Sequence, residues 1–311
     1  LHYETFTWAI YVQYGNFARD LAAALSLVLV ALAIAILMME TKTRGRAAYY
    51  TQAISIGRPQ TLVKLGNWRW PAMLFCVIVV VFSLLGPIMV LAHWVLRGIS
   101  AGEEVFIQWG HLSNTLYVSG LAALVIVIAA VPISILAVRY SGRISSVLEK
   151  LSYIGFALPG IVVALSIVFF GVHYATPLYQ TLPLLMFAYL VLFLPTAVGN
   201  IRTSYVQVSP ALEEAARSLG RSPLQVFTSV TLPLIIPGIL AGTAMVFMVT
   251  IKELPATLIL SPIGFKTLAT SIWWATEDAF FAKAAVSALL LISASTVPMA
   301  VLGWLGSKKV T

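Results

Sequence analysis

The sequence alternates between long apolar runs without a formal charge and shorter segments that hold the charged residues. A helix that crosses a bilayer needs about 20 mostly apolar residues, with about 17 as the lower limit. A charge at mid-bilayer costs at least about 2.5–3.5 kcal/mol on insertion scales. These criteria predict seven spans: Leu21–Met39, Pro71–Leu96, Leu112–Val138, Leu151–Val172, Leu182–Ile201, Leu234–Ile251 and Ala284–Gly306. We therefore expect an all-α fold, a polytopic bundle of transmembrane helices.

The longest charge-free stretch covers residues 151–201 and contains no Asp, Glu, Lys or Arg. At about 1.5 Å of rise per residue it is far longer than the ~30 Å core of a bilayer. It must therefore hold two spans, and the segment His173–Pro177 is the natural turn between them.

The positive charges decide on which side of the membrane each loop lies. With seven spans the loops alternate between two faces; Lys and Arg number 14 on one face and 5 on the other, whereas Asp and Glu number 4 and 7. Lys and Arg gather on the cytoplasmic side of membrane proteins. The C-terminus is therefore predicted in the cytoplasm, and residue 1 outside.

The composition agrees with lipid as the solvent. Hydrophobic residues make up 60% of the chain and charged residues 10%, whereas a soluble domain carries about 25% charged residues. The formal net charge of +8 follows from the asymmetry between the two faces, so no nucleic-acid partner is expected. The single cysteine, Cys76, permits no disulfide within the chain.

The first residue is Leu1, and no charged-then-apolar signal segment follows it. We expect a longer polypeptide, in which an earlier segment brings residue 1 across the membrane. The basic, polar stretch after the first span is typical of a cytoplasmic linker. The predicted organisation is an outer segment with one orphan span (1–39), the linker (40–70) and a six-span domain (71–311) with a cytoplasmic loop at 202–233.

This cytoplasmic loop has the local signals of two helices separated by a turn. Ser209 can cap the first helix, Pro210 suits its first position, and Glu213 and Glu214 follow soon after. Gly220 suits the left-handed position that ends a helix. The pattern then starts again, with Ser222 as the cap, Pro223 at the first position and an apolar run to Leu232–Pro233. From the residues alone, a surface hairpin without a partner is as acceptable as a contact surface.

A longer motif in this loop resembles the signature loop of bacterial ATP-binding-cassette import permeases. Its residues are Glu214, Ala215, Ala216, Gly220, Val230, Thr231, Leu232 and Pro233. The one departure is Val230, where the family more often has isoleucine. The resemblance implies that the loop docks into a cleft on a cytoplasmic ATPase, with the first three residues on the docking helix, where Ala215 and Ala216 form a small-residue face. It also implies two ATPase subunits, a periplasmic substrate-binding protein and a place in the bacterial inner (plasma) membrane.

Three further segments are similar to the second half of ferric iron permeases: Phe156–Ala164, Lys252–Thr257 and Gly264–Thr270. In that family two six-span halves are fused, so the resemblance implies a missing N-terminal permease half in the same polypeptide. It implies ferric iron as the substrate. Related permeases for thiamine, sulfate, molybdate and polyamines share the general motif and remain alternatives.

Two places outside the loop are candidate sites. Lys252, Glu253 and Pro255 lie where the sixth span ends, as a gate or a contact with the docked binding protein; the alternative is an interfacial ion pair. Pro159 and Gly160 are candidates for a kink that lines the pathway, or for a helix-packing notch. The outer loop 252–283 has room for a short interfacial helix, and Trp273 and Trp274 suit the headgroup level.

Other chemistry finds little support. The four histidines fall near the predicted outer face without metal-site spacing, so we expect no metal site and no cofactor. No Walker-type loop is present, so ATP hydrolysis is expected on a separate subunit, and no catalytic constellation indicates an enzyme. An ion-coupled secondary transporter is the main rival, but such proteins place ionisable residues inside their spans. A channel would not need a capped docking loop.

Overall fold

The computed structural model describes residues 5–43, 65–104, 106–140 and 142–307, and in these ranges every regular element is helical. The longer helices are α1 (Phe6–Gly15), α2 (Arg19–Thr43), α3 (Arg69–Ser100), α4 (Trp109–Arg139), α5 (Arg143–Tyr153), α6 (Gly160–Tyr174), α7 (Leu182–Val206), α10 (Leu232–Thr250), α12 (Leu268–Glu277) and α13 (Phe281–Ser307). Shorter elements are η1 (Gly66–Trp68), η2 (Ile154–Phe156), η3 (Thr176–Leu178), α8 (Pro210–Ser218), α9 (Pro223–Val226), η4 (Phe227–Thr231) and α11 (Pro255–Leu260). Most of the predicted linker, 44–64, lies outside the described residues.

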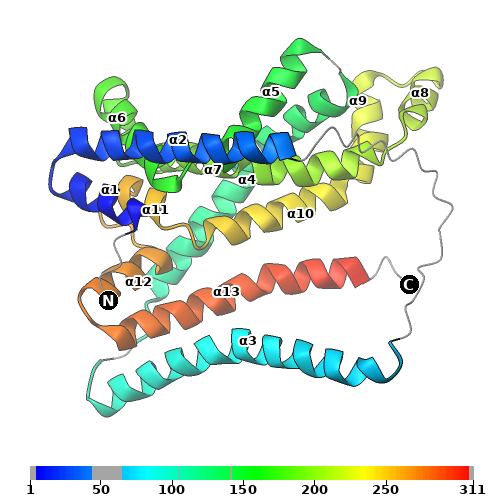
Figure 1. Ribbon diagram of the computed structural model, residues 1–311. Coiled ribbons are helices and arrows are strands. Elements are labelled where there is room, and N and C mark those ends of the chain that lie inside the picture. Colours follow the sequence, from blue (N-terminus) through cyan, green and yellow to red (C-terminus); the bar gives the residue numbers. More distant parts are fainter. Residues whose placement is uncertain (1–4, 44–64, 105, 141, 308–311) are drawn as a thin grey trace.

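Helices form at the positions of all seven predicted spans. Within the described residues five are long and apolar enough to cross a bilayer, and a bent pair makes six if its two arms count as one span. The last predicted span falls on α13, a helix of 27 residues, of which this count covers only Phe281–Thr296. The long helices run side by side along one direction, with α4 crossing them obliquely (Figure 1).

The predicted span Leu151–Val172 is broken at Pro159–Gly160, the position named as a candidate kink. The chain turns there by 110° between the arms Arg143–Phe156 and Gly160–Tyr174. Pro159 has extended backbone angles and cannot donate an amide hydrogen bond, so the new helix begins just after it. The first arm includes the polar helix α5, and the 15-residue α6 measures only about 22 Å.

The core lies where α4, α7 and α10 pack together, with α6 and α11 against them. Its fully buried members include Val118, Ile126, Leu185, Tyr189, Val198, Ile201, Val246 and Leu260. Small residues let α7 and α10 approach closely: an added Cβ at Gly238 would lie 2.4 Å from the Ser204 Cβ atom, whereas one at Gly242 would make ordinary contacts of 3.5 Å or more with Ala197. Close approach at glycine is typical of helix crossings in membranes.

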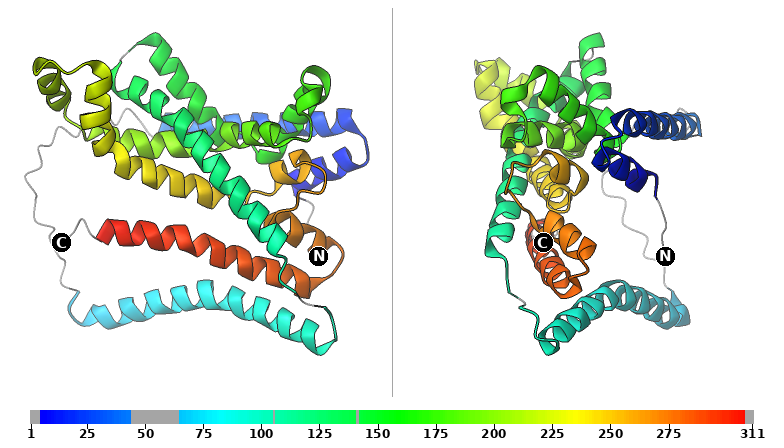
Figure 2. Two further views of the ribbon diagram at one scale, coloured as in Figure 1. Left: turned by 180° about the vertical axis from the view of Figure 1, so that it is seen from behind. Right: turned by 90° about the vertical axis from the view of Figure 1, so that its left-hand side faces the viewer.

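Within the described residues, helices α3 and α13 contribute no buried residue to this core. Helix α3 packs along α13, and both are seen beside the remaining bundle from two directions (Figure 2). In the span that contains α3, no residue of the most apolar stretch is buried inside the protein. Its outer surface carries large apolar side chains, for example Phe75, Phe82 and Met89, at 63–75% exposure. Such a surface is stable only against lipid or another apolar surface.

The N-terminal helices pack against the rest at the end of the bundle opposite α8 and α9 (Figure 1). Ile10 of α1 is buried against Ile161 and Val162 of α6, with apolar residues of α2 around them. The rings of Trp8 and Tyr11 lie 5.7 and 5.6 Å from the Trp273 ring of α12. The 252–283 loop holds two short helices, α11 and α12, where one was expected.

Candidate functional site

The predicted helix–turn–helix of the 202–233 loop is confirmed as α8, a turn and α9, and it protrudes at one end of the bundle (Figure 1). Gly220 has φ +81°, in the left-handed region. The Arg221 amide donates to the Ala216 carbonyl and the Gly220 amide to that of Arg217, the pairing of a Schellman motif. We call this unit the α8–α9 hairpin.

The two predicted caps of the α8–α9 hairpin have different outcomes. Ser222 and Gln225 form a reciprocal capping box at the start of α9, with Pro223 at its first position. Ser209 stands at the cap position of α8, and Pro210 follows it, but the Ser209 side chain makes no capping bond. The expectation of a Ser209 cap is therefore wrong.

The tip of the hairpin exposes large apolar side chains. Leu219 is 83% exposed, Leu224 is 71% exposed and Leu212 is 50% exposed. Glu214 and Ala215 are also exposed, whereas Ala216 is buried. The expected small-residue face of both alanines is thus corrected to Ala215 alone, because Ala216 is buried. Leu232 and Pro233, half-buried and exposed, begin α10.

Glu213, next to the exposed Glu214, is buried and bound by three other elements. Arg139 Nε at the end of α4 lies 3.0 Å from its Oε2 atom. The Tyr205 hydroxyl of α7 and the Thr231 hydroxyl of η4 donate to Oε1 at 3.1 and 2.9 Å. We call Arg139, Tyr205, Glu213 and Thr231 the inner network.

Arg139 makes two more contacts in the inner network. Its Nη2 atom donates to the Val208 carbonyl at 2.7 Å, and its guanidinium lies 4.6 Å from the centre of the Tyr205 ring. Burial alone would raise the pKa of Glu213, but the hydrogen bonds from Thr231, Arg139 and Tyr205, together with the Arg139 charge, lower it below its ordinary value. The carboxylate is therefore ionised at neutral pH.

Sequence reasoning missed Arg139 and Tyr205 as site residues, and it gave Thr231 only as a member of the signature motif. Arg139 was counted only as a charge at the end of a span. The bonds of Tyr205 and Thr231 to Glu213 were not predictable, because these residues lie 8 and 18 positions from Glu213 and meet it only after folding. The element that brings Thr231 into place is the π-helical turn η4; such turns are frequent at functional sites.

At the other end of α10, two predicted sites lie together. An added Cβ at Gly160 would be 3.2 Å from Glu253 Oε1 and 3.7 Å from the Pro255 Cβ atom, so the bend after Pro159 abuts the segment that follows α10. Glu253 does not pair with the exposed Lys252: its Oε1 atom accepts from the Ala256 amide at 3.1 Å. The interfacial ion-pair alternative therefore does not describe this site.

A buried polar chain extends from the Glu253 backbone. The Thr257 hydroxyl donates to the Glu253 carbonyl at 2.7 Å, and the buried Tyr189 hydroxyl lies 2.6 Å from the same Thr257 oxygen. Because the single Thr257 proton is used on the carbonyl, Tyr189 is the donor. Burial raises the pKa of the Glu253 carboxyl, and the Ala256 amide lowers it only in part. We call Glu253, Thr257 and Tyr189 the outer cluster.

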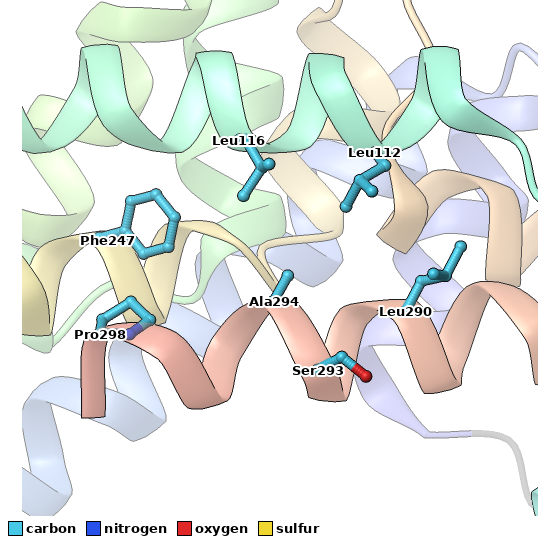
Figure 3. Close-up of a pocket in the computed structure, with 7 residues that line it drawn as sticks. All are labelled: Leu112, Leu116, Phe247, Leu290, Ser293, Ala294 and Pro298. Atoms are coloured by element: carbon cyan, nitrogen blue, oxygen red, sulfur yellow. The ribbon is translucent and has the colours of Figure 1, made fainter. Parts of the chain in front are cut away.

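An open cleft of about 390 Å³ lies between α4, α10 and α13 (Figure 3). Its walls are Leu112, Leu116, Phe247, Leu290, Ser293, Ala294 and Pro298. The Ser293 hydroxyl, the one polar side-chain group among them, donates to the Leu289 carbonyl of its own helix. This cleft therefore offers no ligands to an ion. In the described ranges, no three His, Cys, Asp or Glu side chains gather as a metal site would require.

Comparison with known proteins places the chain among transport proteins. The model of a family described as "Binding-protein-dependent transport system inner membrane component" matches residues 122–310. Over 306 residues the chain is 39% identical to the Fe(3+)-transport system permease protein FbpB 2 of Haemophilus influenzae, which covers 96% of this chain; the chain spans only 60% of that relative's length. It is 27% identical over 150 residues to the molybdate/tungstate transport system permease protein WtpB of Pyrococcus abyssi, covering 48% of this chain and 59% of that one.

Solved structures agree on the fold. The MetNI methionine ABC transporter, in inward facing conformations, matches with a TM-score of 0.51 at 16% identity, over 65% of this chain and 94% of that chain. A bacterial alginate ABC transporter, solved in complex with alginate pentasaccharide-bound periplasmic protein, matches with a TM-score of 0.57 at 17% identity, over 76% and 92%. At these identities the likeness concerns the fold alone.

Proposed function

Because the chain belongs to the family of binding-protein-dependent transport system inner membrane components, we propose that it is a membrane-spanning permease of an ATP-binding-cassette importer. The observation that carries the proposal is the α8–α9 hairpin, which exposes Leu212, Leu219 and Leu224 beyond the bundle. Exposed apolar side chains on a short helix with a defined C-terminal turn are typical of a surface that a partner covers. ATP binding and hydrolysis would occur on two separate cytoplasmic subunits.

The hairpin residues have different roles in this proposal. Glu214 and Ala215, both exposed, contact the ATPase, and Gly220 makes the turn between the helices. Ala216 and Glu213 face inward and hold the hairpin on the bundle. Leu232 and Pro233 carry the chain into α10.

The proposed substrate is ferric iron, delivered by a periplasmic binding protein. Its support is the 39% identity with an Fe(3+)-transport permease across nearly this whole chain. The molybdate/tungstate relative is less similar and matches about half of the chain, so a permease for another small solute is the second candidate. No tight iron site is required of the permease itself, because the binding protein captures the substrate.

The proposed mechanism is alternating access. ATP binding closes the two ATPase subunits, their movement displaces the hairpins, and the spans open towards the loaded binding protein; hydrolysis restores the inward-facing state. Glu253 and Pro255, beside the bend at Pro159–Gly160, form the proposed outer gate, with the exposed Lys252 as a contact for the binding protein. Two helix breaks in contact support this role, because they are places where backbone angles change most easily.

The proposed orientation puts the α8–α9 hairpin and the C-terminus in the cytoplasm. Its support is the excess of Lys and Arg on that face. We propose further that 1–39 belongs to a first permease half, 40–70 links the halves, and 71–311 is the second half. The exposed apolar surface of α3 suits a contact with such a first half or with lipid.

The test is substrate uptake in cells that lack the full-length gene, complemented with wild type, Gly220→Asp or Gly220→Asn. Ferric iron, thiamine, sulfate and molybdate are offered separately. Asn adopts left-handed backbone angles readily and has the shape of Asp. An added Cβ at Gly220 meets nothing within 4 Å. The difference between the Asp and Asn variants therefore reports the effect of a negative charge at the turn. We expect only iron uptake to depend on the gene, with Asn active and Asp impaired. Loss of a different solute's uptake would overturn the assignment of ferric iron as the substrate. Uptake that does not depend on ATP would overturn the assignment to the importer class.

A further inference from the structure

We infer that Arg139 and Glu213 are positioning residues that fix α8 to the inner ends of α4, α7 and α10, so that displacement of the hairpin reaches these helices through the inner network rather than along the chain. This inference rests on the proposed function. It concerns residues that do not face the partner: the side chains of Arg139 and Glu213 are only 16% and 11% exposed.

The contacts of one carboxylate carry the inference. Both oxygens of Glu213 are used, and its three donors come from α4, α7 and η4, one from each. The Arg139 guanidinium adds a bond to the Val208 carbonyl, which lies between α7 and α8. These contacts join α8 and the ends of three helices into one rigid body. Movement of any of them relative to α8 is unfavourable, because it would leave the buried charge of Glu213 without one of its donors.

The covalent route between α8 and α10 is less direct. It passes through the turn at Gly220, which has left-handed angles and where an added Cβ would meet nothing within 4 Å. Thr231, by contrast, lies immediately before α10 and donates straight to Glu213. The inner network therefore bypasses the turn.

Helix α10 then connects the two ends of the molecule. It begins next to Thr231 and ends at Thr250, three residues before Glu253 of the outer cluster. Along its length it packs on α4 and α7, the other two helices that the network holds. A shift of α8 is thus delivered to the helix that leads to the proposed outer gate.

The experiment uses the complete transporter, reconstituted in lipid with its ATPase subunits and supplied with loaded binding protein. The variants are Glu213→Gln, Arg139→Gln and the double variant, and the readouts are ATPase copurification and substrate imported per ATP hydrolysed. We expect copurification at the wild-type level and a fall of about 10-fold in substrate per ATP, within the usual range of coupling between sites. The double variant should be no worse than the worse single variant, because both remove the same link.

Two controls separate this role from general loss of structure. Glu149→Gln breaks the Arg202–Glu149 ion pair (3.0 Å) between α5 and α7, outside the network, and should leave substrate per ATP unchanged. Tyr205→Phe keeps the ring beneath Arg139 and removes only one donor to Glu213. This variant should fold more readily than the Gln variants and should show a smaller fall in substrate imported per ATP.

A chemical cross-link gives the decisive comparison. In a Cys76→Ser background, Arg139→Cys with Glu213→Cys removes the ion pair, and a short bifunctional maleimide then joins the two helices again. Restored substrate per ATP after cross-linking supports the inference. Wild-type ratios in both Gln variants overturn it, as does loss of ATPase copurification, which would make Glu213 a docking residue. Failure of the wild-type chain to copurify with any ATPase would instead overturn the proposed function.

Discussion

Two neighbouring glutamates on α8 have opposite environments. Glu213 is buried and accepts hydrogen bonds on both oxygens, while Glu214 is exposed at the proposed docking surface. Adjacent positions on a helix point about 100° apart, so one residue faces the bundle and the next faces away from it. The inner residue holds the hairpin, and the outer one is free to contact a partner.

Glu213 makes the hairpin sensitive to acid. Its pKa lies below the ordinary value of 4.5, so its contribution to stability is complete above that value and is lost as the pH falls through the lowered pKa. Glu213→Gln should lower the free energy of unfolding by about 1–3 kcal/mol at pH 7. Thermal unfolding in detergent between pH 3.5 and 7 should show the two proteins converging at the acid end. A difference independent of pH would mean that the charge of Glu213 is not what holds α8.

The Tyr189–Thr257 bond predicts unequal effects of two conservative substitutions. Tyr189→Phe removes a donor and leaves the Thr257 hydroxyl bonded to the Glu253 carbonyl. Thr257→Val leaves both the buried Tyr189 hydroxyl and the Glu253 carbonyl without this hydrogen-bond partner. We expect a loss of about 1 kcal/mol for the first and about 2–3 kcal/mol for the second. Equal losses in thermal unfolding would contradict the assignment of Tyr189 as the donor.

At the scale of elements, the crossing of α7 and α10 predicts a contrast between two glycines one turn apart. Gly238→Ala would place a Cβ 2.4 Å from the Ser204 Cβ atom and 3.0 Å from the Asn200 carbonyl oxygen, so the helices must separate. We expect this overpacking to cost about 1–3 kcal/mol.

Gly242→Ala is the matched control for that crossing. Its added Cβ would meet Ala197 and Asn200 at 3.5–3.6 Å, which is ordinary contact. The unfolding midpoint of this variant should stay at the wild-type value or rise slightly, because alanine favours the helix. A drop as large as that of Gly238→Ala would show that helix α10 does not cross α7 in this way.

Element positions were largely predictable because charge-free runs and end signals are local. The α8–α9 hairpin, the turn at Gly220 and the start of α9 at Pro223 all follow from residues within a few positions. Pro159 and Gly160 indicated a kink, but the size of the bend was not predicted, since length and hydropathy do not distinguish a mildly kinked span from two arms that meet at 110°. The inner network and the contact of Gly160 with Glu253 depend on residues far apart in sequence, so no local pattern indicates them.

At the scale of the whole molecule, the proposed orientation predicts which loops a reagent reaches. In a Cys76→Ser background, Glu103→Cys lies between α3 and α4 and Arg221→Cys lies in the hairpin, and both positions are exposed. A membrane-impermeant maleimide should label the first in intact spheroplasts and the second only after permeabilisation. The opposite pattern would reverse the orientation and remove the hairpin from the compartment that holds ATP.

The bend between α5 and α6 has a consequence for the surrounding lipid. A 15-residue helix covers about 22 Å, roughly 8 Å less than an average hydrocarbon core. Such hydrophobic mismatch is relieved by local thinning of the bilayer or by neighbouring protein, at a fraction of a kcal/mol for each ångström. Acyl-chain length therefore acts on the bend directly, and a thicker membrane favours conformations in which α6 is shielded from lipid.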